Sequence, residues 1–107
     1  MTYAERALDA LGDPTRRAVF KHLRAGARSV GEIADRMDVS RPAVSQHLKV
    51  LKTARLVADR AEGTRRFYTV DARGIDALRT WLDGFWDQAL TAFKAAAESE
   101  GAKERKR

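Results

Sequence analysis

The spacing of apolar and polar positions between residues 29 and 52 predicts two short amphipathic helices joined by a tight turn. Apolar side chains recur three and four residues apart in each helix, which places them on one face. These positions are Val30, Ile33, Ala34 and Met37 in the first helix, and Val44, Leu48 and Leu51 in the second. Each helix is therefore expected to bury one side in a common core.

Short polar residues mark the start of each of these helices. Ser29 can cap the first helix, and Glu32 three residues later completes a capping box. Ser40 can cap the second helix, where Pro42 is tolerated because a first-turn N–H has no partner within the helix. The turn therefore falls between these two caps.

The outer face of the second helix is polar and basic. Its side chains are Arg41, Ser45, Gln46, Lys49 and Lys52. Such groups donate to and accept from base edges and phosphates. A helix pair of this size with such a second helix is typical of a DNA-binding helix-turn-helix. The pattern therefore predicts double-stranded DNA as a partner.

Two further helices are predicted before this pair. Residues 3–11 form a short amphipathic helix that Gly12 ends. Asp13 and Pro14 then supply a cap followed by proline, which starts a helix that runs to about Arg24. The basic side chains of this helix, Arg16 among them, lie on a solvated face or contact phosphate, and the solvated face is the favoured reading.

A β-hairpin follows the helix-turn-helix. Two strands, 56–61 and 65–70, are joined by a glycine-containing turn at 62–64, and Tyr68 and Val70 are expected to point inward. Polar side chains near the tip are Arg60, Thr64, Arg65 and Arg66. The hairpin therefore presents a second group of cations beside the proposed DNA-reading helix.

A long apolar stripe occupies one further helix, from Gly74 to about Ala97. A small domain cannot cover so long a stripe, so the surplus predicts a second copy of the chain. The alternative is a helix that folds back wholly onto its own domain. The residues assigned to the interface of this homodimer are Tyr3, Leu8, Leu78, Trp81, Leu82, Phe85, Trp86, Ala89 and Phe93.

Composition limits the remaining possibilities. The chain has 107 residues, which suits one domain at 1–97, and the charged segment 98–107 is expected to be disordered. No cysteine is present, so neither a disulfide framework nor a thiolate metal site is expected. No apolar run has the length of a membrane span, and the first residues lack a signal-peptide core. We therefore expect a cytoplasmic protein with no membrane partner.

Net charge is concentrated in one part of the chain. The total is +6, and residues 40–66 carry seven basic against two acidic side chains. This local excess lies on the second helix of the pair and on the hairpin, and it indicates a surface for a polyanion.

Taken together, these segments resemble the ArsR/SmtB family of bacterial winged helix-turn-helix repressors. The stretches that carry the resemblance are LGDPTRRAVFKHL (11–23), VGEIADRMDVSRPAVSQHLKVLKTARLV (30–57) and RAEGTRRFYTV (60–70). The resemblance implies a mainly α fold with a small β-hairpin, in the order α-α-α-α-β-β-α, dimerised through the first and last helices. It also implies a repressor of its own operon.

The chain departs from the metal-sensing members of that family. Residues 30–35 contain no cysteine, and the last helix has aspartates but no histidine. His22 and His47 are isolated, whereas a transition-metal site needs three or four converging ligands. We therefore expect no metal cofactor and no tight Zn²⁺ or Ni²⁺ site, and the effector stays open.

The predicted DNA contacts combine the second helix and the hairpin. They are Ser40, Arg41, Ser45, Gln46, His47, Lys49, Arg60, Thr64, Arg65 and Arg66. His47 either contacts DNA or borders the core, and its place beside Gln46 favours DNA. In a dimer these helices would read an inverted repeat.

Two other classes of function are disfavoured. A winged helix that binds protein would normally expose apolar groups where this chain concentrates positive charge. An enzyme would need paired carboxylates, a nucleophile–base set or a phosphate-binding glycine loop, and the sequence has none of these.

Overall fold

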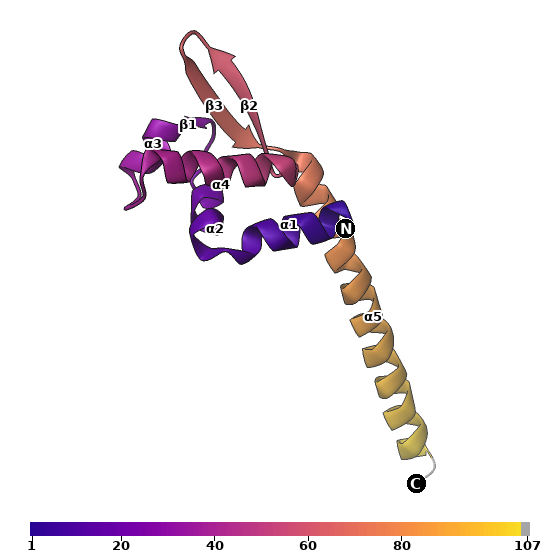
Figure 1. The fold of residues 1–107 in the computed structure, drawn as a ribbon. Coiled ribbons are helices and arrows are strands. Elements are labelled where there is room, and N and C mark those ends of the chain that lie inside the picture. The colour runs from indigo at the N-terminus through magenta and orange to yellow at the C-terminus, as the bar shows by residue number, and fades with distance from the viewer. Residues whose placement is uncertain (106–107) are drawn as a thin grey trace.

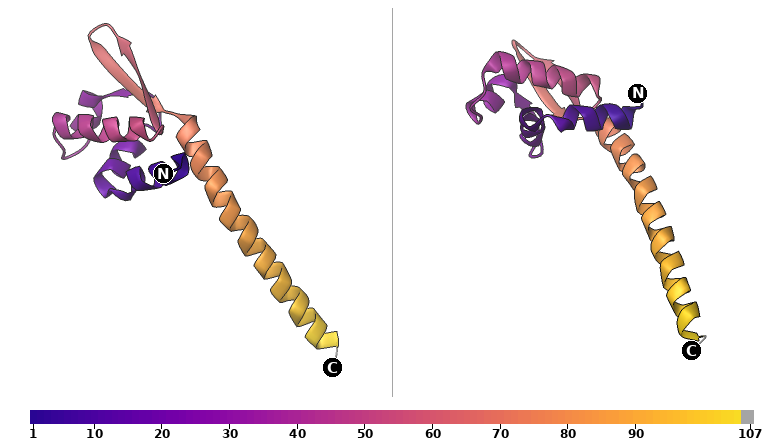
Figure 2. Two further views of the ribbon diagram at one scale, coloured as in Figure 1. Left: turned by 45° about the vertical axis from the view of Figure 1, so that its right-hand side comes forward. Right: turned by 60° about the horizontal axis from the view of Figure 1, so that its bottom comes forward.

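The computed structural model describes residues 1–105, and the side chains of residues 1–101. The elements follow one another as α1 (Tyr3–Gly12), α2 (Pro14–Lys21), β1 (Arg28–Ser29), α3 (Val30–Asp35), α4 (Arg41–Thr53), β2 (Val57–Glu62), β3 (Arg65–Val70) and α5 (Ala72–Arg105). The first four helices gather at one end, the hairpin extends from them, and α5 leaves as a rod (Figures 1 and 2). The overall extents are 75 × 25 × 25 Å.

Side-chain caps start the helices where the sequence predicts them. Ser29 Oγ accepts a hydrogen bond from Glu32 N at 3.2 Å, and the Glu32 side chain accepts one from Ser29 N in return. Ser40 Oγ accepts from Ala43 N at 3.3 Å at the start of α4. These bonds satisfy N–H groups that have no partner within the helix, and they confirm the predicted starts.

The sheet has one more strand than predicted. The hairpin of β2 and β3 is confirmed, and Gly63 adopts a φ of 61° in its turn. The short β1 adds to the free edge of β3, which gives the antiparallel order β1-β3-β2. A two-residue strand has no alternation to detect, so the sequence pattern missed it. Tyr68 packs against the core as expected, whereas Val70 at the end of β3 stays 39% exposed.

The core lies among the first four helices and the start of β2. It consists of Ala7, Ala10, Val19, Leu23, Ile33, Val44, Leu48, Leu51, Ala54, Leu56 and Val57. The three α4 positions in this set are the predicted stripe. Their burial fixes which side of α4 faces outward.

Helix α5 belongs to this core only at its start. Ile75 and Leu78 pack against the core, and α1 lies beside the first turns, whereas every side chain from Arg79 to Glu100 is exposed. Among the described residues, no helix combines the length and apolarity that crossing a bilayer requires.

The end of α5 corrects a prediction. The helix was expected to end at about Ala97, with disorder over 98–107, but it continues to Arg105. Alanine, glutamate, lysine and arginine dominate the added segment, and all are strong helix formers, so its charge does not end the helix. Residues 106–107 lie outside the described residues.

The fully buried position of Leu48 gives a test of this core. Leu48→Ala should lower the free energy of unfolding by about 2–5 kcal/mol, because it removes buried methyl groups and leaves a cavity. Val50→Ala is the matched control on the same helix, since Val50 is 41% exposed, and should change stability by less than about 0.5 kcal/mol. Chemical denaturation measures both, and equal effects would contradict this packing.

Candidate nucleic-acid interface

The outer face of α4 brings together four of the ten predicted DNA contacts. Val44, Leu48 and Leu51 point into the core, which turns the opposite side of the helix to solvent. Four predicted contacts are exposed on that side: Arg41, Ser45, Gln46 and Lys49. Ser40 is also exposed, but its hydroxyl caps the helix. The face can therefore offer amide, hydroxyl and cationic groups to a groove of DNA.

His47 differs from the other predicted contacts. Its side chain is half-buried, on the helix that packs against α2. The backbone N–H groups of Arg16 and Thr15 lower the pKa of Asp13 at the start of α2, and the nearby charges of Arg16 and His47 contribute to the same shift. Of the two roles considered for His47, this position favours bordering the core.

Asp59 connects the hairpin to α4. Its carboxylate accepts from Lys52 Nζ at 2.8 Å and from Arg66 Nη1 at 2.6 Å, and its side chain is only 9% exposed. The hydrogen bond from Lys52, followed by that from Arg66, lowers the pKa of Asp59. This carboxylate holds in place Arg66, which is a predicted DNA contact, and Lys52, which is not. The role of Asp59 was not predicted from the sequence. Its only sequence signal is an acidic residue within a basic segment.

The other hairpin arginines also have acidic partners. Arg65 Nη2 donates to Ser29 Oγ and to Glu32 Oε1, each at 3.0 Å, which joins the hairpin to the start of α3. Arg60 pairs with Glu62 at 3.1 Å. The side chains of Arg60, Arg65 and Arg66 remain 55–57% exposed. They are therefore positioned by the protein while still accessible to an anion.

A polar cleft lies between the hairpin and the starts of α3 and α4. It has a volume of about 360 Å³ and is lined by Ser29, Val30, Gly31, Glu32, Asp35, Arg41, Thr64, Arg65 and Arg66. The Arg41 side chain lies over Gly31, where a Cβ would come within 3.2 Å of the guanidinium carbon. Three predicted arginines and Thr64 thus meet in one cleft, and no sequence pattern indicated the part played by Gly31.

Two other arginines serve internal contacts. Arg16 donates to the backbone oxygens of Ala10 at 2.5 Å and Asp9 at 3.3 Å, which joins α2 to α1. Arg55 stacks on the ring of Tyr3, with its guanidinium carbon 3.8 Å from the ring centroid. Part of the charge excess in residues 40–66, that of Arg55, is therefore directed away from the outer face of α4.

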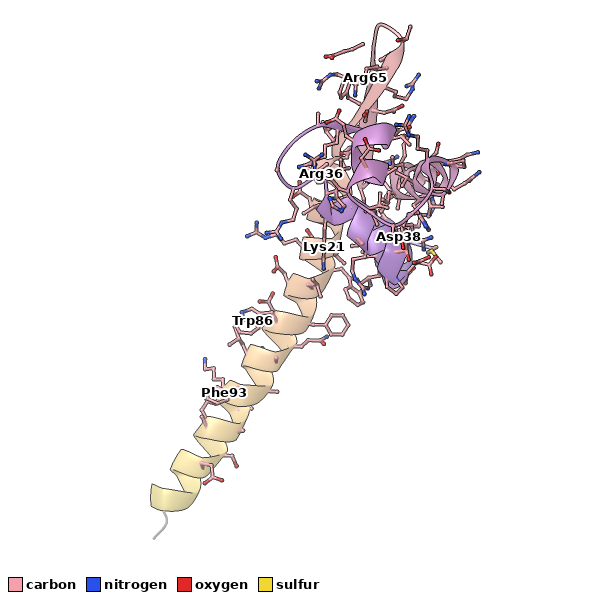
Figure 3. The ribbon with its side chains drawn as sticks, turned by 90° about the vertical axis from the view of Figure 1, so that its left-hand side faces the viewer. Lys21, Arg36, Asp38, Arg65, Trp86 and Phe93 are labelled. Atoms are coloured by element: carbon pink, nitrogen blue, oxygen red, sulfur yellow. The ribbon has the colours of Figure 1, made fainter. Side chains whose placement is uncertain are left out.

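The residues predicted for a dimer interface lie on α1 and along α5. On α5 the exposed fraction rises from 38% for Trp81 to 64% for Trp86 and 73% for Phe93. Trp81 and Phe85 make an edge-to-face pair with ring centroids 4.6 Å apart. Figure 3 shows Trp86 and Phe93 on the projecting part of α5, far from Arg65 on the hairpin. The apolar and cationic surfaces are thus separate.

Metal-ligating side chains are scattered in the part of the chain that the structure describes. No three His, Cys, Asp or Glu residues lie close enough there to hold a metal ion.

The fold and this face define a DNA-binding protein of the winged-helix class. A helix-turn-helix domain model matches residues 11–60. The chain is 59% identical to the HTH-type transcriptional regulator Rv2034 of Mycobacterium tuberculosis over 97 residues, which is 91% of each chain. It is 32% identical to the transcriptional repressor SdpR of Bacillus subtilis, over 71% of this chain and 84% of that protein.

A solved structure agrees with these relatives. The homodimeric winged helix-turn-helix DNA-binding domain of Mb0332 from Mycobacterium bovis, a possible ArsR-family regulator, has a TM-score of 0.63 at 30% identity, covering 82% of each chain. The chain therefore belongs to the ArsR/SmtB-type family of winged helix-turn-helix transcriptional regulators. This confirms the resemblance and the fold class that the sequence indicated.

The lowered pKa of Asp59 leads to a pH-dependent prediction. Because the pKa is lower in the folded protein, the carboxylate stabilises the fold above its ordinary value of 3.8, and this stabilisation is lost as the pH falls through the lower folded value. Asp59→Asn should therefore reduce the melting temperature at neutral pH, and the difference from the wild type should vanish in acid.

Glu62→Gln is the matched control for Asp59→Asn. Glu62 is 56% exposed beside Arg60, and an exposed pair contributes little to stability. Thermal unfolding followed by circular dichroism across the acid range compares the two variants. A deficit for Asp59→Asn that persists unchanged at the lowest pH would contradict the assigned role.

Proposed function

We propose that this chain is a sequence-specific repressor of its own operon that binds an inverted repeat as a homodimer and does not respond to metal. The observation that carries the proposal is the separation of two surfaces within one chain. A polar and cationic face lies on α4 and the hairpin, and an exposed apolar stripe lies along α5. The first suits DNA and the second suits another copy of the chain.

The apolar stripe supports the homodimer. Large side chains on α5 remain largely open in the monomer, and Tyr3 and Leu8 add exposed apolar surface on α1. A contiguous exposed patch of this kind marks an association surface, and a symmetric pair would cover it with the same patch from the partner. Leu78 is half-buried against the core, so it sits at the margin of this proposed interface.

The roles of the DNA-contacting residues follow from their chemistry and placement. Gln46 can pair with adenine and Arg41 with guanine in the major groove, because each presents two groups to one base edge. Lys49 suits a phosphate, and Ser40 and Ser45 suit short contacts near the start of α4. The hairpin residues Arg60, Thr64, Arg65 and Arg66 suit the backbone or the adjacent minor groove. His47 is half-buried and would contact DNA only at the edge of this interface.

Symmetry then determines the form of the DNA site. A two-fold dimer would place its two α4 helices in successive major grooves, about 34–36 Å apart, so its site would be an inverted repeat. Repression is supported by the likeness to SdpR, which is a transcriptional repressor. The scattered ligating groups support a role without a metal effector. A cytoplasmic location is part of the same proposal.

Two alanine variants separate base reading from phosphate binding. Gln46→Ala should reduce the preference for the operator over other sequences by about 1–3 kcal/mol. Arg65→Ala should weaken binding to all sequences alike and lower the salt slope by about one. Fluorescence anisotropy with specific and scrambled duplexes over a salt series measures both. Equal weakening of every sequence by Gln46→Ala would remove its base-reading role.

A charged substitution on α5 tests the homodimer. Phe93→Asp should produce monomers and abolish operator binding, because it places a carboxylate in the proposed apolar interface. Thr91→Asp is the matched control, since residue 91 lies on the opposite side of the helix. Sedimentation velocity compares the two variants. A Phe93→Asp protein that remains dimeric would place the interface elsewhere.

A further inference from the structure

A residue just beyond the end of α4 has an unusual backbone conformation. Ala54 caps the C-terminus of α4, and Arg55, the next residue, has a φ of 60°. It is the one residue other than glycine with a positive φ among residues 1–105. This region is costly for a residue with a Cβ, and it persists only where the surroundings hold it in place. The contacts of Arg55 should therefore show what holds it.

The backbone around Arg55 connects the end of α4 to the start of α5. The Arg55 carbonyl accepts a hydrogen bond from Gly74 N at 2.9 Å, and the Leu56 carbonyl accepts one from Asp71 N at 2.9 Å. A Cβ on Gly74 would lie 2.4 Å from the Arg55 carbonyl oxygen. Only glycine therefore allows α5 to lie this close to the end of α4.

The side chain of Arg55 reaches a third helix. Its guanidinium stacks on Tyr3, the first residue of α1, at 3.8 Å from the ring centroid. The N-terminus lies beside the start of α5 in both views of Figure 2. The pKa of Asp71 is lowered mainly by its hydrogen bonds with Arg73, and the charge of Arg55 contributes to the same shift. A single residue thus contacts the DNA-reading helix and both helices of the proposed dimer surface.

We propose that Arg55 is a positioning residue for DNA recognition, which fixes the angle between α4 and the α1–α5 surface. In a symmetric dimer this angle sets the separation of the two DNA-reading helices, and hence the half-site spacing that the protein accepts. The inference rests on the proposed homodimer. It assigns to Arg55 a role in geometry, with no contact to DNA.

Spin labels on the reading helices test this geometry without DNA. The chain has no cysteine, so Ser45→Cys provides one labelling site on the exposed face of each α4. Dipolar spectroscopy on the full chain then gives the distance between the two labels of a dimer. The Ser45→Cys protein should show one narrow distance distribution.

Two substitutions at Arg55 separate its side chain from its backbone. Arg55→Asn tolerates the positive φ and removes the stack on Tyr3, whereas Arg55→Gly also loosens the backbone. Both should broaden the label distance distribution or displace its maximum while the protein stays dimeric. Arg24→Ala removes an exposed arginine that lies outside α1, α4 and α5; it is the control and should leave the distribution unchanged.

The outcomes distinguish this inference from the proposal on which it rests. If the labelled Ser45→Cys protein gave no dipolar signal, the chain would not dimerise. That result would contradict both the proposed homodimer and the role of Arg55. A dimeric Arg55→Asn protein with the narrow distribution of the parent would overturn the role of Arg55 alone. Broadening by Arg55→Gly only would also overturn it, because the backbone would then be sufficient.

DNA binding gives a second measurement, the preference for one half-site spacing over others. Loss of stability alone would not change this preference. Operators with half-sites one base pair closer or farther apart should bind the parent much less well than the natural spacing. In Arg55→Asn this discrimination should fall about tenfold, an amount typical of losing a cation–π contact. Affinity for a single half-site should not change. A variant that keeps the full spacing preference would contradict the proposal.

Discussion

The packing of α4 against the core is the constraint on which the rest of the molecule depends. Val44, Leu48 and Leu51 bury one side of this helix between α2, α3 and the first strand of the hairpin. A helix has only one orientation that buries such a stripe, so the same three residues decide which side chains face outward. The chemistry of the outer face follows from the burial of the inner one.

Electrostatic contacts then hold the hairpin relative to α4. Asp59 joins Lys52 to Arg66, and Glu32 joins α3 to Arg65. Cations that are already paired and half-exposed lose less freedom when a phosphate approaches, although part of their attraction is offset by the acidic partner. The paired cations give this face a defined shape, although its net positive charge is lower than it would be without the acidic partners. A face of defined shape suits recognition of a particular sequence.

Local patterns were sufficient to predict most of the fold. The caps at Ser29 and Ser40, the stripes of α3 and α4 and the hairpin strands all depend on residues a few positions apart. The projecting stripe of α5 was also predictable, because its apolar spacing exceeds what a small core can cover. The expected end of that helix was wrong, since composition alone does not separate a charged helix from a charged coil.

The features that sequence reasoning missed depend on contacts between distant segments. The pairing of β1 with β3, the contact of Arg41 with Gly31 and the junction of Arg55 with Tyr3 and Gly74 all appear only when the chain is folded. His47 is a different case, because its neighbour Gln46 is exposed while His47 is half-buried. His47 lies three residues after Val44 and four before Leu51, so helical spacing itself places it beside the buried stripe.

Fluorescence anisotropy would show whether this chain recognises a particular DNA sequence. The purified chain would be titrated against DNA from upstream of its own gene and against a scrambled duplex of equal length, over a range of salt. We predict a preference of about 10³ or more for the upstream DNA at physiological salt. Equal binding to both duplexes would contradict sequence-specific recognition. No binding to either would contradict the nucleic-acid interface itself and favour the alternative of a winged helix that binds protein.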